Sequence, residues 1–260
     1  MISKLCRVAS MIVLATFGFS SAARASTCSN ASMSGAYGFM HGGTAVTGLP
    51  TTSVGQIRFD STTGTFTSVT TASHDGVITT ESVPGKYAIA PNCTGKGSFD
   101  LGPGHDISYV VTSTGWLEFL QFTGATQEGF GVKQGSPTCT IAGVAGSFGF
   151  EATGVFVAGA PVTGPVAFIG ELEFSVNTSG DGVISGYVAG GENGTIFAFA
   201  EEPVTGSYSV ATDCTGTATI IPKGRSPLNF SFVIVDGGKE MLAIEMDANT
   251  VVSGTLVKGN

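Results

Sequence analysis

Hydrophobic and polar residues alternate with a period of two along many short stretches of this chain. In residues 54–60 the apolar side chains Ile57 and Phe59 fall on one face, and the opposite face carries Val54, Gln56, Arg58 and Asp60. Residues 171–175 repeat the pattern, with Leu172 and Phe174 set against Glu171, Glu173 and Ser175. A period of two is the spacing of a β-strand, because successive side chains point to opposite faces. These segments therefore predict strands that direct their phenylalanines to one side.

Glycine-containing turns separate these strands from further strand-like runs. The runs cover residues 107–112, 116–122, 230–235 and 241–246, and the breaks fall at 63–64, 75–76, 113–115, 181–182, 193–194 and 236–238. Asp-Gly and Asn-Gly pairs favour tight hairpins, because both central residues adopt positive φ there. Short strands joined by hairpins form an antiparallel meander, which loses its exposed edges when it closes into a barrel. We find almost no helical pattern.

The whole pattern is written twice. Residues 35–39, 55–59, 75–78, 85–95 and 132–133 match residues 146–150, 170–174, 193–196, 206–216 and 257–258, at offsets of 111, 115, 118, 121 and 125. Offsets that only grow are what a tandem duplication with small loop insertions leaves. We predict an all-β chain with a signal peptide at 1–25 and two up-and-down β-barrels of about eight strands each. The modules are expected at 26–135 and 136–260, with little or no helix.

Residues 1–25 have the features of a secretory signal peptide. Lys4 and Arg7 precede an apolar run, and Ala23-Arg24-Ala25 is a small-x-small cleavage pattern, so we expect cleavage near Ala25 and Ser26. No later stretch is long and apolar enough to span a bilayer. The sequence therefore predicts a soluble protein that is secreted or periplasmic.

Composition narrows the possible partners. Without residues 1–25 the chain keeps 19 acidic and 8 of its 11 basic residues, and its formal charge is 8 − 19 = −11. Such a chain is a poor partner for nucleic acid or an anionic membrane surface. The hydrophobic content of 42% and the 18 phenylalanines exclude a disordered chain.

Four cysteines follow the predicted signal peptide, one before the first strand of each module and one after its Tyr-containing strand. An even number of cysteines in an exported chain indicates disulfides. The duplication most simply pairs Cys28 with Cys93 and Cys139 with Cys214. A redox or nucleophilic thiol is the alternative, but the chain has no Cys-x-x-Cys motif and no histidine accompanies both copies.

The motifs, taken in order, carry a resemblance. The first three are a Cys, Gly-x-Tyr/Phe-x-Phe (from Gly35 and Gly146) and Gly-x-apolar-x-Phe. An Asp/Asn-Gly turn follows, and then Gly-x-Tyr-x-apolar-x-x-Asp/Asn-Cys-Thr-Gly (from Gly85 and Gly206). Over nearly the whole mature chain this order resembles small exported bacterial β-proteins with calycin-like or allene-oxide-cyclase-like barrels. The resemblance implies a barrel fold. The catalytic carboxylate of the cyclases cannot be placed on this sequence, so no catalytic residue is carried over.

Ionisable residues give no catalytic or metal-binding pattern. His41 and His74 are replaced by Ala152 and Glu192 in the second module, so a metal site shared with His105 is the weaker interpretation. The acids considered as a buried general base are Glu118, Glu171, Glu173, Glu240, Glu245 and Asp247. If the phenylalanines face inward, these acids should face water. We therefore expect no catalytic residue, no metal and no cofactor.

Three functional hypotheses follow. The first is a non-catalytic exported protein that binds a small apolar ligand inside a Phe-lined barrel. Its candidate lining residues are Phe39, Phe59, Phe119, Phe150, Phe174 and Phe232, with Phe66, Phe99 and Phe197 as further candidates; all are equally candidate core residues. The second is a structural or adhesive envelope protein with filled barrels that binds a cell-surface component. The third, by fold analogy alone, is an isomerase or cyclase with a buried acid. The oligomeric state is open.

Overall fold

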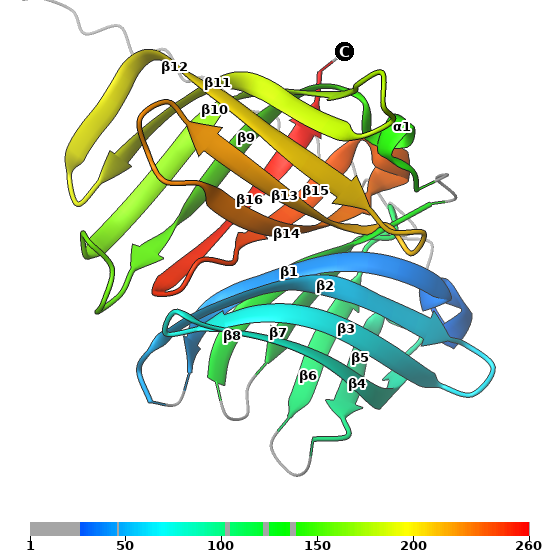
Figure 1. Ribbon diagram of the computed structural model, residues 1–260. Helices are drawn as coiled ribbons and strands as arrows, with labels where there is room; N and C mark the ends of the chain where they lie inside the picture. The colour runs from blue at the N-terminus through cyan, green and yellow to red at the C-terminus, as the bar shows by residue number, and fades with distance from the viewer. Residues whose placement is uncertain (1–26, 46, 102–104, 122–124, 136–138, 260) are drawn as a thin grey trace, which may run out of the picture.

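The chain forms two closed eight-stranded antiparallel barrels, one after the other (Figure 1). The computed structural model describes residues 27–45, 47–101, 105–121, 125–135 and 139–259, with only the backbone at 121, 125 and 197–202. Barrel 1 consists of β1 (Gly35–Ala45), β2 (Pro50–Asp60), β3 (Thr65–His74), β4 (Val77–Ile89), β5 (Thr94–Phe99), β6 (Asp106–Val111), β7 (Leu117–Gln121) and β8 (Ala125–Lys133). Barrel 2 consists of β9 (Gly146–Phe156), β10 (Gly164–Val176), β11 (Gly182–Glu192), β12 (Thr195–Val210), β13 (Thr215–Pro222), β14 (Leu228–Val235), β15 (Glu240–Glu245) and β16 (Thr250–Lys258).

The fold-class prediction is confirmed. Helix in the described residues is limited to α1 (Ile141–Val144) and two 3-10 turns, η1 (Asn30–Met33) and η2 (Asp236–Gly238). None of these described helices is long and apolar enough to cross a membrane. The domain boundaries remain a prediction, because residues 1–26 and 136–138 lie outside the described part of the chain, as does the predicted signal peptide.

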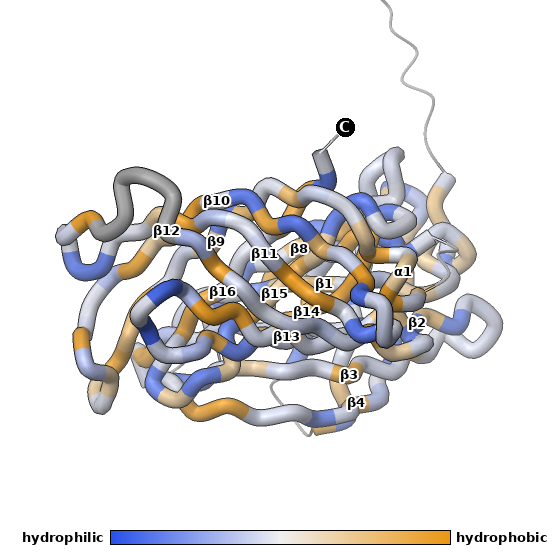
Figure 2. The backbone as a smooth tube through the Cα atoms, turned by 45° about the horizontal axis from the view of Figure 1, so that its top comes forward, coloured by the Kyte–Doolittle hydropathy of each residue, from blue (hydrophilic) through white to orange (hydrophobic). Residues whose placement is uncertain are grey.

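Alternation of apolar and polar residues sets the register of both barrels, and it is visible along the strands in Figure 2. Phe59 pairs with Phe66 across β2 and β3, and both side chains are buried inside barrel 1. Arg58, one position earlier, is exposed on the outer face. The hairpin between β3 and β4 turns at Asp75 and Gly76, with φ of 51° and 78°. Positive φ at both central residues is what a tight Asp-Gly hairpin requires.

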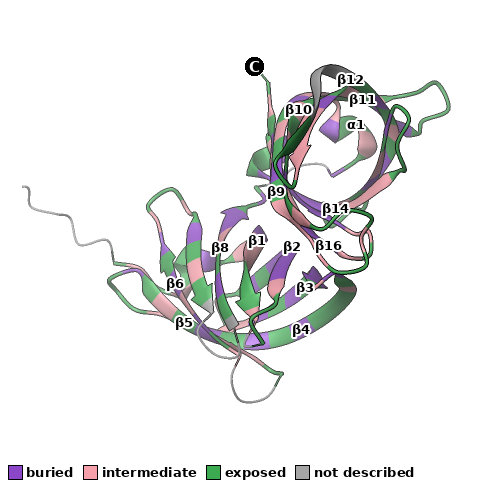
Figure 3. Ribbon diagram, turned by 90° about the vertical axis from the view of Figure 1, so that its left-hand side faces the viewer, coloured by how far each residue is buried: buried purple, intermediate pink, exposed green. Residues whose placement is uncertain are grey.

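A short helical turn covers one end of each barrel, and a disulfide attaches it. The predicted disulfides Cys28–Cys93 and Cys139–Cys214 are both present, each with 5.0 Å between Cα atoms. In barrel 1, Met33 of η1 is completely buried against the core. Barrel 2 is covered by α1, which lies within the ring of strands when that barrel is viewed end-on (Figure 3). Two disulfides indicate that the chain matures in an oxidising compartment.

The repeated tyrosine fixes the same helical turn from inside the barrel. The Tyr208 hydroxyl donates to the Ile141 carbonyl at 2.9 Å, and the Tyr87 hydroxyl donates to the Asn30 carbonyl at 3.2 Å. The Asp/Asn-Cys-Thr part of the motif builds the turn beside it. Asp213 Oδ1 accepts from the Thr215 backbone N–H at 3.0 Å and from its hydroxyl at 2.7 Å. The repeated motif is therefore the closure of each barrel end.

The two barrels share a buried apolar interface. The outer faces of β1 and β2 pack against the outer faces of β14, β15 and β16 (Figures 1 and 3). The interface core is a cluster of aliphatic side chains with Met40 and Phe130 at its edge: Val54, Val132, Val233, Val235, Leu242 and Ile244. Gly38 allows a close approach of the two sheets, because a Cβ there would lie 2.4 Å from Cγ1 of Val235.

Buried glutamines add polar links across this interface. Gln56 Nε2 donates to the Asp213 carbonyl of barrel 2 and to Oε1 of its neighbour Gln134, at 2.8 Å for the second bond. Gln134 Nε2 in turn donates to the Ile234 carbonyl of barrel 2 at 3.1 Å. The Gly237 N–H donates to the Gln134 carbonyl at 3.1 Å. Buried amides are stable only when hydrogen-bonded, so these links fix how the barrels dock. They also explain why barrel 1 has a glutamine, Gln56, at the position where barrel 2 has the exposed Glu171.

Candidate functional site

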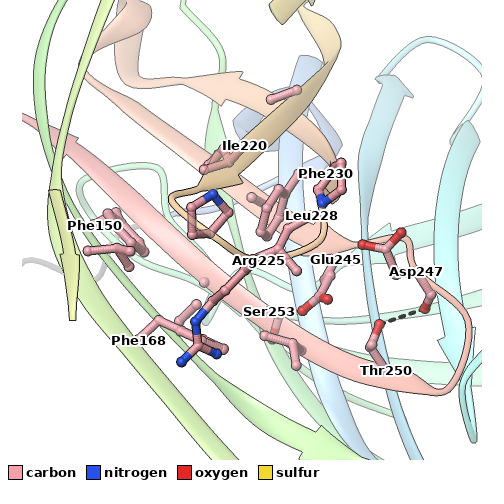
Figure 4. A pocket seen from close by; sticks show the side chains of 18 of the residues that line it. Phe150, Phe168, Ile220, Arg225, Leu228, Phe230, Glu245, Asp247, Thr250 and Ser253 are labelled. Carbon is pink, nitrogen blue, oxygen red and sulfur yellow. Dashed lines mark hydrogen bonds between the residues drawn. The ribbon is translucent and has the colours of Figure 1, made fainter. Parts of the chain in front are cut away.

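Barrel 2 encloses a cavity of about 610 Å³ (Figure 4). Its wall is apolar and carries several aromatic rings: Phe150, Phe156, Phe168, Phe174, Phe230 and Phe232. Met241 and Ala243 of β15 line it from the side that faces barrel 1. The volume lies in the range of roughly 300–1,000 Å³ that small-molecule pockets occupy. Two other depressions, of about 800 and 520 Å³, lie along β4–β7 and β9–β11 and open more widely to solvent.

The end of the cavity opposite the disulfide forms its mouth. The lining residues there come from the turns after β9, β13 and β15: Ala160, Pro161, Val162, Gly224, Arg225, Ser226, Pro227, Asp247 and Ala248. At the other end, α1, with its buried Val144, and the Cys139–Cys214 disulfide close the barrel over Phe148. A ligand would enter from the turn end and extend toward the disulfide end.

Two positions that carry ring side chains in barrel 1 carry alanine in barrel 2, and this explains why barrel 2 is hollow. In barrel 1 the rings of His41 and Phe119 lie 5.8 Å apart, and both contact Phe39. The repeat places Ala152 at the position of His41. Phe119 pairs with Gly129 on the next strand, and Ala243 makes the corresponding pair with Gly254. Barrel 2 therefore has two methyl groups where barrel 1 has two rings.

The predicted lining residues divide between the barrels accordingly. Phe39, Phe59 and Phe119 lie in barrel 1, where Phe39 and Phe59 join a cluster with Tyr37 and Tyr87. Phe66 and Phe99 stack edge-on in the same interior. Phe150, Phe174 and Phe232 all line the cavity of barrel 2. The side chain of Phe197 lies outside the described part of the chain.

Glu245 is a buried carboxylic acid on the wall of this cavity. It is the last residue of β15, pairs with Phe230 of β14 and is 2% exposed. In the described part of the chain its Oε2 atom has no hydrogen-bond partner. Burial, with smaller effects of the nearby Asp247 and Glu192, raises the pKa of Glu245 to about 8. The side chain is therefore largely neutral at pH 7.

The neighbouring acids of the mouth have partners. Asp247 accepts from the Asn229 backbone N–H at 2.9 Å and from its side-chain amide at 2.8 Å, one bond to each oxygen. Glu192 forms an ion pair with Arg225 at 3.3 Å. In the view of Figure 4, Glu245 is drawn between Arg225 and Asp247. Glu245 is thus the acid of this group with an oxygen left for a ligand.

The prediction that all of the candidate acids face water is wrong for Glu245. Glu118, Glu171 and Glu173 are exposed, as the alternation indicated. Glu240 is half-buried, and burial followed by the nearby Asp236 raises its pKa. Glu245 follows Met241 and Ala243 at a spacing of two, on the inner face of β15. Its outer neighbours Leu242 and Ile244 are equally apolar because they contact barrel 1, so periodicity alone could not separate the two faces.

The histidines form no metal site within the described residues. His41 as a residue is half-buried, with its ring in the interior of barrel 1 beside Phe39 and Phe119, and its Nε2 hydrogen-bonds Ser53 Oγ. Burial, followed by the charge of His74, lowers the pKa of His41 to about 4, and a hydrogen bond with Gln127 opposes this shift. His74 hydrogen-bonds Thr51 at 2.8 Å. His105 is partly exposed near the start of β6.

Comparison with known proteins assigns neither a family nor an activity. No family model matches the chain, and a search of curated proteins gives no match. Three solved structures are similar over most of their length. A DUF3598 protein of unknown function from Nostoc punctiforme has 11% identity and a TM-score of 0.27, covering 88% of this chain and 97% of its own. Kievitone hydratase from Nectria haematococca has 6% identity and a TM-score of 0.30, covering 91% and 92%. A putative AttH from Nitrosomonas europaea has 7% identity and a TM-score of 0.26, covering 87% and 93%.

Proposed function

We propose that this chain is an exported binding protein that holds one small apolar molecule inside barrel 2. The observation that supports this function is the Phe-lined cavity of about 610 Å³ with a mouth at one end. Apolar ligands bind such cavities because burial removes their surface and the wall's surface from water. Barrel 1, with His41 and Phe119 in its interior, has the supporting role of docking and stabilising barrel 2.

Binding fits the polar groups of the cavity better than catalysis does. An isomerase or cyclase needs a buried acid, which Glu245 provides, and usually a second group to move a proton or stabilise charge. The other acids near the mouth, Asp247 and Glu192, already have partners. A structural role for filled barrels does not explain why one barrel is hollow.

Calorimetric titration with 1-decanol tests this function. We expect wild-type protein to bind one molecule per chain. Ala243→Phe, which copies Phe119 of barrel 1, should weaken binding at least tenfold by filling the cavity. Ala152→Leu fills less of the cavity and serves as a second variant if the first is unstable. Ala167→Phe adds the same ring to the exposed outer face of β10 and should leave binding unchanged.

Two results would count against apolar binding in barrel 2. One is the absence of any heat of binding with wild-type protein. The other is unchanged affinity in Ala243→Phe and Ala152→Leu, each folded by circular dichroism, since the ligand would then lie elsewhere. If both variants and Ala167→Phe all bind the alcohol with wild-type affinity, the ligand lies at a surface site.

A further inference from the structure

Glu245 is a feature of the cavity that an apolar ligand alone does not use. Its side chain is 2% exposed, and Oε2 has no hydrogen-bond partner among the described residues. Leaving a buried polar atom without a partner is costly, so proteins rarely keep one where it has no use. Figure 4 shows the carboxyl group among the cavity-lining side chains rather than outside the barrel. The geometry therefore offers one polar contact to a bound molecule.

The charged groups around Glu245 determine whether a positively or a negatively charged ligand group is favoured there. Within the described residues, the charged side chains at the cavity are Glu192, Arg225, Glu245 and Asp247, while the exposed side chain of Glu151 lies on the outer face of β9. Three of the four are acids, and Arg225 forms an ion pair with Glu192. A ligand carboxylate would bring more negative charge into this group. A cation would instead be attracted by Glu245 and Asp247 together.

The position of Glu245 along the barrel determines where the polar and the apolar parts of a ligand can lie. Glu245 ends β15 next to the mouth, whereas Ala243 and Met241 line the cavity deeper in the same strand. A polar head at Glu245 thus leaves an apolar path toward Phe232 and the closed end. The head stays close to the mouth, which lowers the cost of removing its charge from water.

We propose that the cavity takes an amphipathic monoamine, whose ammonium group pairs with the Glu245 carboxylate while its hydrocarbon part lies among the phenylalanines. This assignment rests on the proposed function of barrel 2. At neutral pH the free carboxyl group carries a proton, so binding of the ammonium form releases that proton to solvent. The nitrogen keeps its own proton and donates it in a charge-assisted hydrogen bond to Oε2.

Matched ten-carbon probes test the assignment by calorimetry at pH 7.5. We expect n-decylamine to bind about 10- to 100-fold more tightly than 1-decanol, and n-decanoate to bind more weakly than either. Glu245→Gln should reduce the ratio of decylamine to decanol affinity to about one. Glu173→Gln, on the exposed outer face of β10, should leave that ratio as it is in the wild type.

The pH dependence gives a second readout that needs no variant. Because the complex requires the ionised carboxyl group, decylamine affinity should fall up to about tenfold per pH unit as pH decreases from 8 to 6. Decanol affinity should be nearly constant over that range. Equal affinities for decylamine and decanol, or a flat pH profile for decylamine, would overturn the amine assignment while leaving apolar binding intact. Binding of neither probe would overturn the proposed function itself.

Discussion

Two ionisable side chains that point inward, Glu245 and His41, distinguish the interiors of the two barrels. Each is held in its neutral form by burial, which raises the pKa of Glu245 to about 8 and lowers that of His41 to about 4. In barrel 1 the histidine ring fills space and hydrogen-bonds Ser53. In barrel 2 the acid lines a cavity. The two groups affect stability in opposite directions as pH changes, so variants are needed to separate them.

Replacing Glu245 should remove one of these pH dependences. The pKa of Glu245 is raised on folding, so its contribution to stability is complete below the unfolded value of about 4.3 and is lost as pH rises to about 8. We predict that Glu245→Gln gains stability relative to wild type by about 1 kcal/mol per pH unit between pH 5 and pH 8. Urea unfolding at several pH values measures this difference. Glu173→Gln, an exposed acid, should show no such trend.

His41 should show the opposite behaviour. Its pKa is lowered on folding, so its contribution is complete above about 6.5 and is lost as pH falls toward 4. We predict that over that range the free energy of unfolding falls with decreasing pH by about 1 kcal/mol per pH unit more in wild type than in His41→Gln. The same urea titrations report it. An unchanged slope below pH 6.5 would mean that His41 is not buried in its neutral form.

At the scale of elements, the repeated tyrosine and cysteine close one end of each barrel. Both sequence copies end with a Tyr hydroxyl bonded to the helical turn and a Cys whose φ is positive, 66° at Cys93 and 72° at Cys214. The sequence predicted the disulfides because duplication placed one Cys on each side of every repeat. It could not predict the helical turns η1 and α1, because each has only four residues.

Removing the tyrosine hydroxyl should weaken this closure in barrel 2. Tyr208→Phe leaves the Ile141 carbonyl without its donor and should lower the free energy of unfolding by about 1 kcal/mol. Tyr187→Phe is the matched control, because that side chain is 51% exposed on the outer face of β11. Equal stability of the two variants in urea would contradict the role given to Tyr208.

The strands that line the interface show where sequence analysis reaches its limit. Strands β14 and β15 are apolar on both faces, since Phe232 and Met241 face the cavity while Val233 and Leu242 face barrel 1. Alternation identifies the inner face only where the outer one is polar. The Phe-lined interior was therefore predictable from β2 and β10. The inward direction of Glu245 and the docking of the barrels depend on tertiary contacts that no local pattern encodes.

At the scale of the whole molecule, the two barrels form one packed unit. Val235 and Leu242 are completely buried between them, and Gly38 lies against the valines of β14. The duplication is symmetric in strand order but not in environment. On the outer face of β2, barrel 2 covers Val54 and Gln56, whereas their counterparts on β10, Ile169 and Glu171, are exposed.

The repeat supplies a matched pair of glycines to test this docking. Gly38→Ala places a Cβ 2.4 Å from Val235 Cγ1 and should destabilise the protein by about 1–3 kcal/mol. Gly149 occupies the same position in the second repeat, and a Cβ there meets nothing within 4 Å. Gly149→Ala should therefore be close to wild type in thermal unfolding. Equal effects of both substitutions would mean that the barrels do not dock through this face.

A ligand-bound crystal structure tests most directly whether barrel 1 is filled by its own side chains while barrel 2 is hollow. We predict that crystals soaked with 10-bromodecan-1-ol show one anomalous bromine peak per chain, inside barrel 2 toward its closed end, near Phe174 and Phe232. A bromine peak inside barrel 1, peaks confined to the protein surface, or an empty barrel 2 at saturating ligand would contradict it.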